Sequence, residues 1–252
     1  MDPPNEAAEL TPYVVYLDES FFQFWPFDNR SGNFCYAVFG LPQSQLIALG
    51  EFHDEFLHRF QAAVEAELKE DPPAELKSHL FRRLPFNTRR RLGLQLREFM
   101  TRANAFLFAD FTEVRGFVLE GIRSSLARHA HKRLPDDWET LYERRRRELI
   151  ELVKKGKEGI GPVLDRLMGT TIGAVAHFLT TRASSYEVFF DPRQPREDLE
   201  VADSIREFTE MVLNRMHQEE PGRFKGVSGR YKSGELPGLQ VADLLVGEVR
   251  NW

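Results

Sequence analysis

Short apolar segments rich in β-branched and aromatic residues alternate along this chain with longer amphipathic segments. In the longer segments apolar residues recur every three to four positions, which is typical of helices, whereas the short ones have the length and composition of strands. The strand-like segments are 13–17, 34–41, 105–114, 185–190 and 223–228, and the main helical ones are 44–70, 87–102, 163–179, 197–217 and 238–249. This order predicts an α/β fold with a mixed central sheet flanked by helices.

The size of the chain favours a single domain. Its 252 residues, 42% of them hydrophobic, are enough to bury one large core. Residues 116–181 are mostly helical in pattern, so we expect a helical insertion within one domain that spans residues 1–252. The segment 105–114 alternates poorly, which predicts a strand buried on both faces, and Asn87 is expected to cap the helix that it begins.

No segment has the composition of a membrane span. The longest apolar stretches are far shorter than the ~20 residues that cross a bilayer, and acidic and proline residues stand where a signal peptide has basic ones. We therefore expect a cytoplasmic protein that does not bind a membrane. The single cysteine, Cys35, excludes an internal disulfide and a multi-cysteine metal site.

Charge is distributed unevenly along the chain. The net charge is -5, but residues 82–157 contain 19 basic and 10 acidic side chains, which leaves 15 basic and 29 acidic ones elsewhere. Such a split is expected when one part of a protein holds a polyanion and an acidic cluster elsewhere holds cations. The solvated face of a long helix around the arginines 144–147 explains the same composition.

Three acidic residues occupy positions where an unpaired charge is costly. Asp18 and Asp191 each follow a strand-like segment, and Asp243 lies inside an apolar helical segment. Carboxylates brought together at such positions repel one another unless they share a divalent cation. The three acids together indicate a metal site, although each alone is also explained as a cap, a turn former or the partner of a basic side chain.

Four motifs, in an order that spans almost the whole chain, resemble the prokaryotic family catalogued as domain of unknown function 3800. They are Tyr16-Leu17-Asp18-Glu19-Ser20, Glu75-Leu76-Lys77-Ser78, Val188-Phe189-Phe190-Asp191 and Pro237-Gly238-Leu239-Gln240-Val241-Ala242-Asp243-Leu244-Leu245. The resemblance implies a ribonuclease H-like fold. In that fold, acids on the first strand, a later strand and the final helix bind divalent metal for phosphodiester cleavage.

The resemblance also assigns roles to individual residues. Asp18 would bridge two metal ions, Mg²⁺ or Mn²⁺, with Asp191 and Asp243 beside it. Glu75 would supply a fourth carboxylate, a place that Glu120 takes in the general ribonuclease H-like pattern. Lys77 would neutralise the phosphate to be cleaved, or is an exposed loop lysine. These roles imply a metal-dependent nuclease that acts on DNA or RNA.

A second function stays open, a non-catalytic nucleic-acid- or protein-binding module on the same scaffold, in phage defence or mobile-element biology. Other chemistries lack their motifs, because the chain has no Gly-x-Ser-x-Gly nucleophile elbow and no P-loop. His129 and His131 are spaced for opposite sides of a helix, which does not suit a zinc site. The sequence leaves open the choice between DNA, RNA and a hybrid, the mode of cleavage and the oligomeric state.

Overall fold

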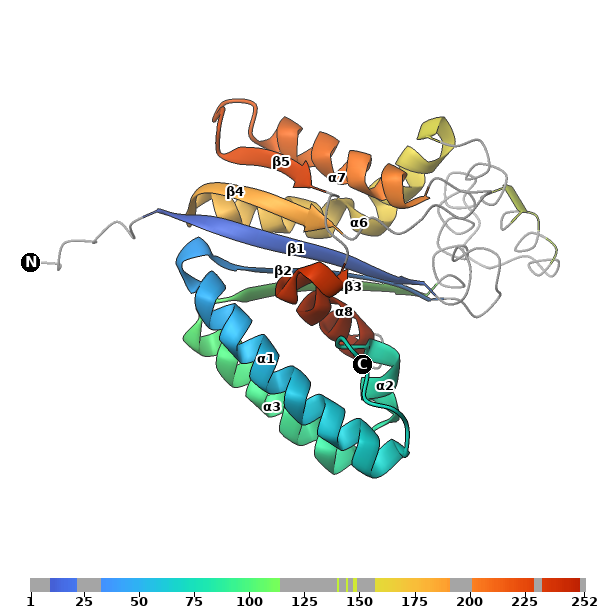
Figure 1. The fold of residues 1–252 in the computed structure, drawn as a ribbon. Coiled ribbons are helices and arrows are strands. Elements are labelled where there is room, and N and C mark those ends of the chain that lie inside the picture. Colours follow the sequence, from blue (N-terminus) through green and yellow to red (C-terminus); the bar gives the residue numbers. More distant parts are fainter. Residues whose placement is uncertain are drawn as a thin grey trace, which may run out of the picture.

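The computed structural model describes residues 10–21, 33–113, 157–190, 201–228 and 233–249, together with residues 140, 144, 147 and 148. Within them the chain forms a five-stranded mixed sheet with helices on both faces (Figure 1). The strands are β1 (Thr11–Phe21), β2 (Asn33–Pro42), β3 (Phe106–Glu113), β4 (Ala183–Phe190) and β5 (Phe224–Ser228), in the spatial order β3-β2-β1-β4-β5. The predicted α/β class with a mixed sheet is confirmed. In this described part of the chain no helix is both long enough and apolar enough to cross a membrane.

Strand β1 lies at the centre of the sheet, between an antiparallel and a parallel neighbour. It pairs antiparallel with β2 up to its last residue, Phe21, and β2 pairs antiparallel with the edge strand β3. On its other side β1 runs parallel to β4, and the last described pair there is Leu17 with Phe190. Strand β5 extends the parallel part of the sheet. Two kinds of strand pairing therefore meet on β1.

The predicted end of the first strand is wrong. We expected it to end at Leu17 with Asp18 beyond it, but β1 continues to Phe21, and Asp18 pairs with Ala37 of β2. The hairpin partner extends the strand because it satisfies backbone groups of residues whose own strand propensity is weak. Asp18 is therefore a residue inside β1, and it follows the last described pair between β1 and β4.

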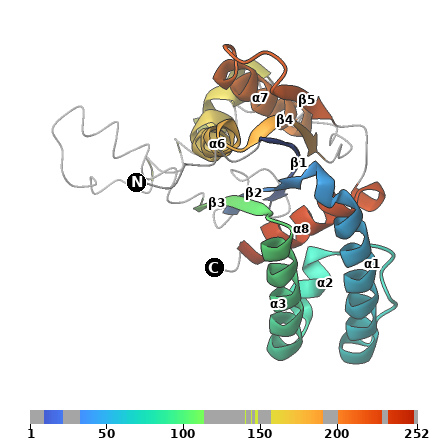
Figure 2. The same cartoon turned by 90° about the vertical axis from the view of Figure 1, so that its left-hand side faces the viewer.

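One face of the sheet is covered by α8 and by helices that reach beyond the sheet. Along the chain these are α1 (Leu46–Ala63) with a π-helical turn (Val64–Leu68), α2 (Ser78–Arg83), α3 (Phe86–Arg102) and α8 (Pro237–Val249), and short 3-10 turns at Gln43–Gln45 and Ser233–Glu235 precede α1 and α8. Helices α1 and α3 lie side by side and extend away from the sheet, with α2 between them (Figure 2). The rings of Phe52 and Phe99 stack 4.3 Å apart between these two helices. We call residues 46–102 the helical arm.

The other face of the sheet is covered by α6 (Lys157–Thr180) and α7 (Val201–Met216). Phe178 of α6 packs against Phe106 and Phe108 of β3, and the hydroxyl of Thr171 donates a hydrogen bond to Asp110 at 3.3 Å. Helix α6 belongs to the stretch 116–181 that we predicted to be an insertion, and it packs on the sheet. Most of the rest of that stretch lies outside the described residues, so the insertion stays a prediction.

Two local predictions are wrong, and periodicity does not predict α2. Strand β3 lies at the edge of the sheet. It is not buried on both faces as predicted, since Ala109 is exposed and Leu107 and Phe108 are half-buried. Helix α3 begins at Phe86 without a side-chain cap, so Asn87 lies inside the helix. Helix α2 has six residues, too few to show a helical repeat in the sequence.

Helix α8 lies close against the sheet because Gly238 has no side chain. A Cβ atom at Gly238 would lie 2.2 Å from the ring of Tyr16 on β1. About two turns later along α8, Val246 packs with Ala37 of β2 in the core. These contacts fix α8 across β1 and β2 and determine the direction in which its polar residues point.

Replacement of Gly238 with alanine is expected to lower the free energy of unfolding by about 1–3 kcal/mol, the usual cost of overpacking a core. The Tyr16 ring is 3% exposed and has little room to move aside. Gly93→Ala in α3 is the control, because a Cβ atom there meets nothing within 4 Å, and it should be neutral or stabilising by up to about 1 kcal/mol. Urea unfolding compares the two variants, and a fully stable Gly238→Ala protein would contradict this account of α8.

His217 is a buried histidine near the other face of the sheet. Its side chain is 3% exposed, and its ring packs edge-on against Tyr186 of β4 with 5.5 Å between ring centroids. Burial lowers the pKa of His217 below its ordinary value of 6.5 because the protonated ring loses hydration. The charge of Glu220 raises this pKa and that of Arg223 lowers it, so the neutral form is favoured on balance.

The lowered pKa of His217 predicts that the folded state loses stability as the pH falls below about 6.5. Above this value the ring is neutral in both states and contributes nothing. Below it the unfolded chain takes up a proton while the folded one does not, until the pH reaches the lower pKa of the folded state. Glu220→Gln should enlarge the loss, because it removes the charge that raises the pKa, and His217→Gln should abolish it. Urea unfolding at a series of pH values measures the slope, and an unchanged slope in His217→Gln would contradict the prediction.

Candidate functional site

Helix α8 carries two polar side chains on one side, among apolar residues of the same helix. Gln240 and Asp243 are three residues apart, so they leave the helix on the same side. Their neighbours Val241, Ala242 and Leu244 are buried in the core. Gln240 is itself only 4% exposed, and its amide therefore needs hydrogen-bond partners inside the protein.

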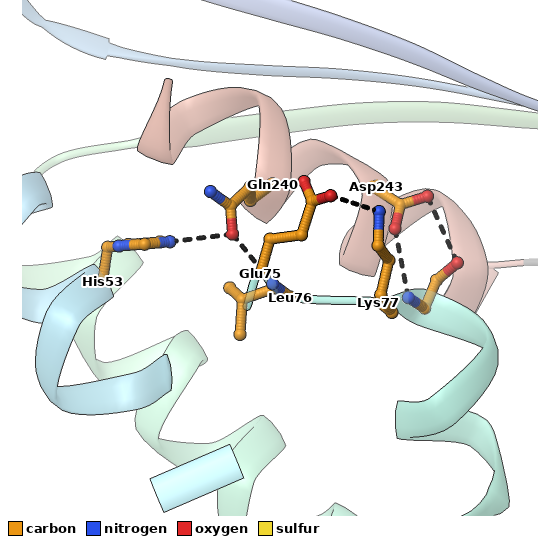
Figure 3. Close-up of polar contacts among 7 residues, drawn as sticks. His53, Glu75, Leu76, Lys77, Gln240 and Asp243 are labelled. Carbon is orange, nitrogen blue, oxygen red and sulfur yellow. Dashed lines mark hydrogen bonds and ion pairs between the residues drawn. The ribbon is translucent and has the colours of Figure 1, made fainter. Parts of the chain in front are cut away.

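These partners lie in the segment 75–78, which passes along α8 just before α2 (Figure 3). The backbone N–H of Leu76 donates to Gln240 Oε1 at 2.8 Å. The backbone N–H and the hydroxyl of Ser78 donate to Asp243 Oδ2 at 3.1 Å and Oδ1 at 3.2 Å. Asp243 thus satisfies a backbone donor at the first residue of α2 that has no partner within the helix. Together the two side chains attach the segment to α8.

His53 extends this hydrogen-bond network to helix α1. Its side chain is buried, and Nε2 lies 3.0 Å from Gln240 Oε1. An amide oxygen only accepts hydrogen bonds, so Nε2 is the donor in this contact. Nδ1 lies 3.2 Å from the carboxylate of the adjacent residue, Asp54. One oxygen of Gln240 therefore connects α1, α8 and the segment 75–78.

Glu75 and Lys77 form an ion pair at the partly exposed edge of this network. Lys77 Nζ donates to Glu75 Oε1 at 2.7 Å, and the two side chains are 37% and 28% exposed. The other carboxylate oxygen, Oε2, lies 3.2 Å from the position of a Cβ atom at Gly234, in the turn before α8. Glu75 therefore lies against the start of α8, within reach of solvent.

Asp18 is a buried acid on the strand that α8 covers. Its exposed fraction is 3%. Side chains alternate along a strand, so Asp18 lies on the same face of β1 as Val14 and Tyr16, which share a core cluster with residues of α8. The contact of Gly238 with Tyr16 brings α8 onto this face two residues before Asp18. Asp18 thus belongs to the layer where β1 and α8 meet.

The structure locates only some of the predicted site residues. Asp18, Glu75, Lys77 and Asp243 belong to the same side of the sheet, whereas Asp191 and the alternative ligand Glu120 lie outside the described residues. Phe190, which precedes Asp191 in the sequence, pairs with the residue before Asp18. Among the residues that the structure describes, no three His, Cys, Asp or Glu side chains form a group able to hold a metal ion.

Three residues of the network were not predicted as site residues: Ser78, Gln240 and His53. Gln240 and Ser78 belong to the quoted motifs, and the spacing of Gln240 and Asp243 by one helical turn signals a shared face. His53 gives no such signal, because its partner is 187 residues away in the sequence.

Gln240→Ala is expected to lower the free energy of unfolding by about 1–3 kcal/mol for each of the two buried donors that it leaves without an acceptor. The donors are the Leu76 N–H and His53 Nε2. Gln61→Ala is a matched control, since Gln61 is half-buried and donates one hydrogen bond to the carbonyl of Pro73, and it should cost about 0.5–1.5 kcal/mol. Urea unfolding gives both values, and equal costs would argue against a central role for Gln240.

Comparison with models of protein families and with curated proteins gives no match to this chain. The resemblance to the family of domain of unknown function 3800 therefore rests on the four motifs alone. Two of these motifs, the one at 75–78 and the one on α8, lie in direct contact through the hydrogen bonds of Gln240 and Asp243.

Proposed function

We propose that this protein is a metal-dependent nuclease that hydrolyses phosphodiester bonds of DNA or RNA. The observation that carries the proposal is the position of α8, which holds Asp243 and the segment of Glu75 on the face of β1 that bears the buried Asp18. These acids come from the beginning, the first third and the end of the chain. The described mixed sheet is compatible with the ribonuclease H-like fold that the sequence motifs imply.

The chemistry of these side chains fits Mg²⁺ or Mn²⁺. Asp18, Glu75, Asp191 and Asp243 offer only carboxylate oxygens, which hard divalent cations prefer. Both described hydrogen bonds of Asp243 come from Ser78, a neutral residue, so its negative charge is available to a cation. When bound, a pair of such ions activates a water molecule and stabilises the leaving oxygen of a phosphodiester.

Residues of the chain itself would position the substrate. The ammonium group of Lys77 lies beside Glu75 and is 37% exposed in its side chain, so it can attract a phosphate as a point charge. Asp18 is only 3% exposed, so the packing around it limits the movement of its carboxylate. The contacts of Gln240 with Leu76 and of Asp243 with Ser78 would keep the Glu75–Lys77 pair in place.

Asp18→Asn is expected to abolish cleavage of nucleic acid in the presence of Mg²⁺ or Mn²⁺. The loss should exceed the about 10- to 100-fold effect of removing a residue that only supports a metal ligand. Asp110→Asn is the matched control, because Asp110 is bonded to α6 on the opposite face of the sheet, and it should retain activity. Cleavage of labelled DNA and RNA, with Mn²⁺ binding followed by calorimetry, measures both effects. Activity that survives Asp18→Asn would reject the nuclease.

The second candidate is a binding module without catalysis. It is favoured by the hydrogen bonds that Asp243 and Glu75 already make within the chain, since such bonds also suit a purely structural role. The same experiments separate the two functions. A module would cleave neither DNA nor RNA when Mg²⁺ or Mn²⁺ is added, and calorimetry would find no Mn²⁺ binding that Asp18→Asn removes.

A further inference from the structure

The helical arm carries its charges on separate helices. Helix α1 with its π-helical turn has five acidic residues and one arginine, Arg59, whereas α2 and α3 together have seven arginines and one acid, Glu98. The side of α2 and α3 is therefore strongly basic in a chain whose net charge is -5. Segregation of this kind directs a polyanion to one side of the arm.

Three of the seven arginines serve the fold. Arg82 Nε donates to the backbone carbonyl of Ser78 at 3.2 Å, and Arg89 Nη1 donates to the carbonyl of Arg82 at 3.1 Å. Arg83 forms an ion pair with Glu70. The other four are exposed and form no ion pair with any other described residue: Arg90, Arg91, Arg97 and Arg102. Their positive charges face solvent along α3.

Arg90 and Arg97 form a row along α3. They are seven residues apart, close to two helical turns, so both guanidinium groups leave the helix on one side, about 10.5 Å apart along its axis. Along the axis of a duplex this distance corresponds to about three phosphates of one strand, with about 3.4 Å of axial rise for each. Leu94, between them, is 47% exposed. Arg90 and Arg97 can therefore each contact a phosphate of the same strand.

A groove of about 450 Å³ lies between α1 and α3, on the side of α3 that carries Arg91, Leu92 and Gln95. Arg90 and Arg97 leave the helix on a different side. It is lined by three alanines and by Arg91, His58 and Arg59, and Arg59 forms an ion pair with Glu55. Its single acid, Glu67, accepts a hydrogen bond from Thr88. Among the described residues that line the groove, Arg91 is therefore the one arginine without an ion pair to another described residue.

We propose that the exposed arginines of α3, with Arg91 at the groove, bind the phosphate backbone of a nucleic acid strand. The identity of the polyanion rests on the proposed function. Helix α2, which leads into α3, begins at Ser78, and Ser78 is hydrogen-bonded to Asp243. The basic surface is therefore connected through α2 to the proposed site of cleavage. Phosphate contacts of this kind position a substrate without reading its bases.

The experiment measures binding of a fluorescent single strand and of a duplex by anisotropy, with EDTA present so that no cleavage occurs. The salt concentration is varied from about 50 to about 200 mM, because the slope of log affinity against log salt reports the number of phosphate contacts. In the double variant Arg90→Gln, Arg97→Gln the slope should become shallower by about 1.8 for a duplex or about 1.4 for a single strand, since each lost contact removes about 0.9 or about 0.7.

Arg215→Gln is the control, since Arg215 is an exposed arginine of α7 on the opposite face of the sheet. Its slope should equal that of the wild type. The proposed binding surface would be rejected if the salt slope decreased equally in both variants or did not decrease in the double variant. It would also be rejected if the wild-type protein bound polyglutamate but no oligonucleotide. Asp18→Asn should keep metal-free binding. A wild-type protein that binds nucleic acid but cleaves none when Mg²⁺ or Mn²⁺ is added would reject the nuclease and leave the α3 surface supported.

Discussion

The close packing of α8 on the sheet is the constraint on which the rest of the candidate site depends. Gly238 lets the helix approach the ring of Tyr16 closer than any other residue would allow. With one side of α8 against β1 and β2, Gln240 and Asp243 on another side reach the backbone of Leu76 and Ser78. Because both sets of contacts belong to one short helix, a shift of α8 would disturb the sheet and the segment 75–78 together.

Strand β1 brings the two halves of the fold to one place. Its antiparallel partner β2 leads directly into the helical arm, and its parallel partner β4 leads towards Asp191. Asp18 lies where the described pairing with β4 has ended and the pairing with β2 continues. A ligand or substrate at Asp18 would therefore lie near both the antiparallel and the parallel half of the sheet. An edge strand has only one neighbouring strand and would not allow this.

The sequence predicts the elements of this fold better than their environment. Local periodicity and composition were sufficient for the strands, for α1, α3 and α8, and for the mixed sheet. They do not give the edge position of β3, because its apolar residues Phe106 and Phe108 pack against Phe178 of a distant helix. They likewise miss His53, whose partner on α8 is set by tertiary packing alone. Asp243 was predictable because an acid in an apolar helix needs a partner.

The separation of charge within the chain bears on how one protein could hold both cations and a polyanion. Acids near β1 attract divalent ions, but their own charge repels phosphate. Arginines mixed among these acids would neutralise them as ion pairs. In the described structure Lys77 is paired with Glu75, whereas four exposed arginines lie on α3. Ser78, a neutral residue at the start of α2, connects the two regions. Because the arginines of α3 and the acids near β1 lie apart, the two groups do not neutralise each other as ion pairs.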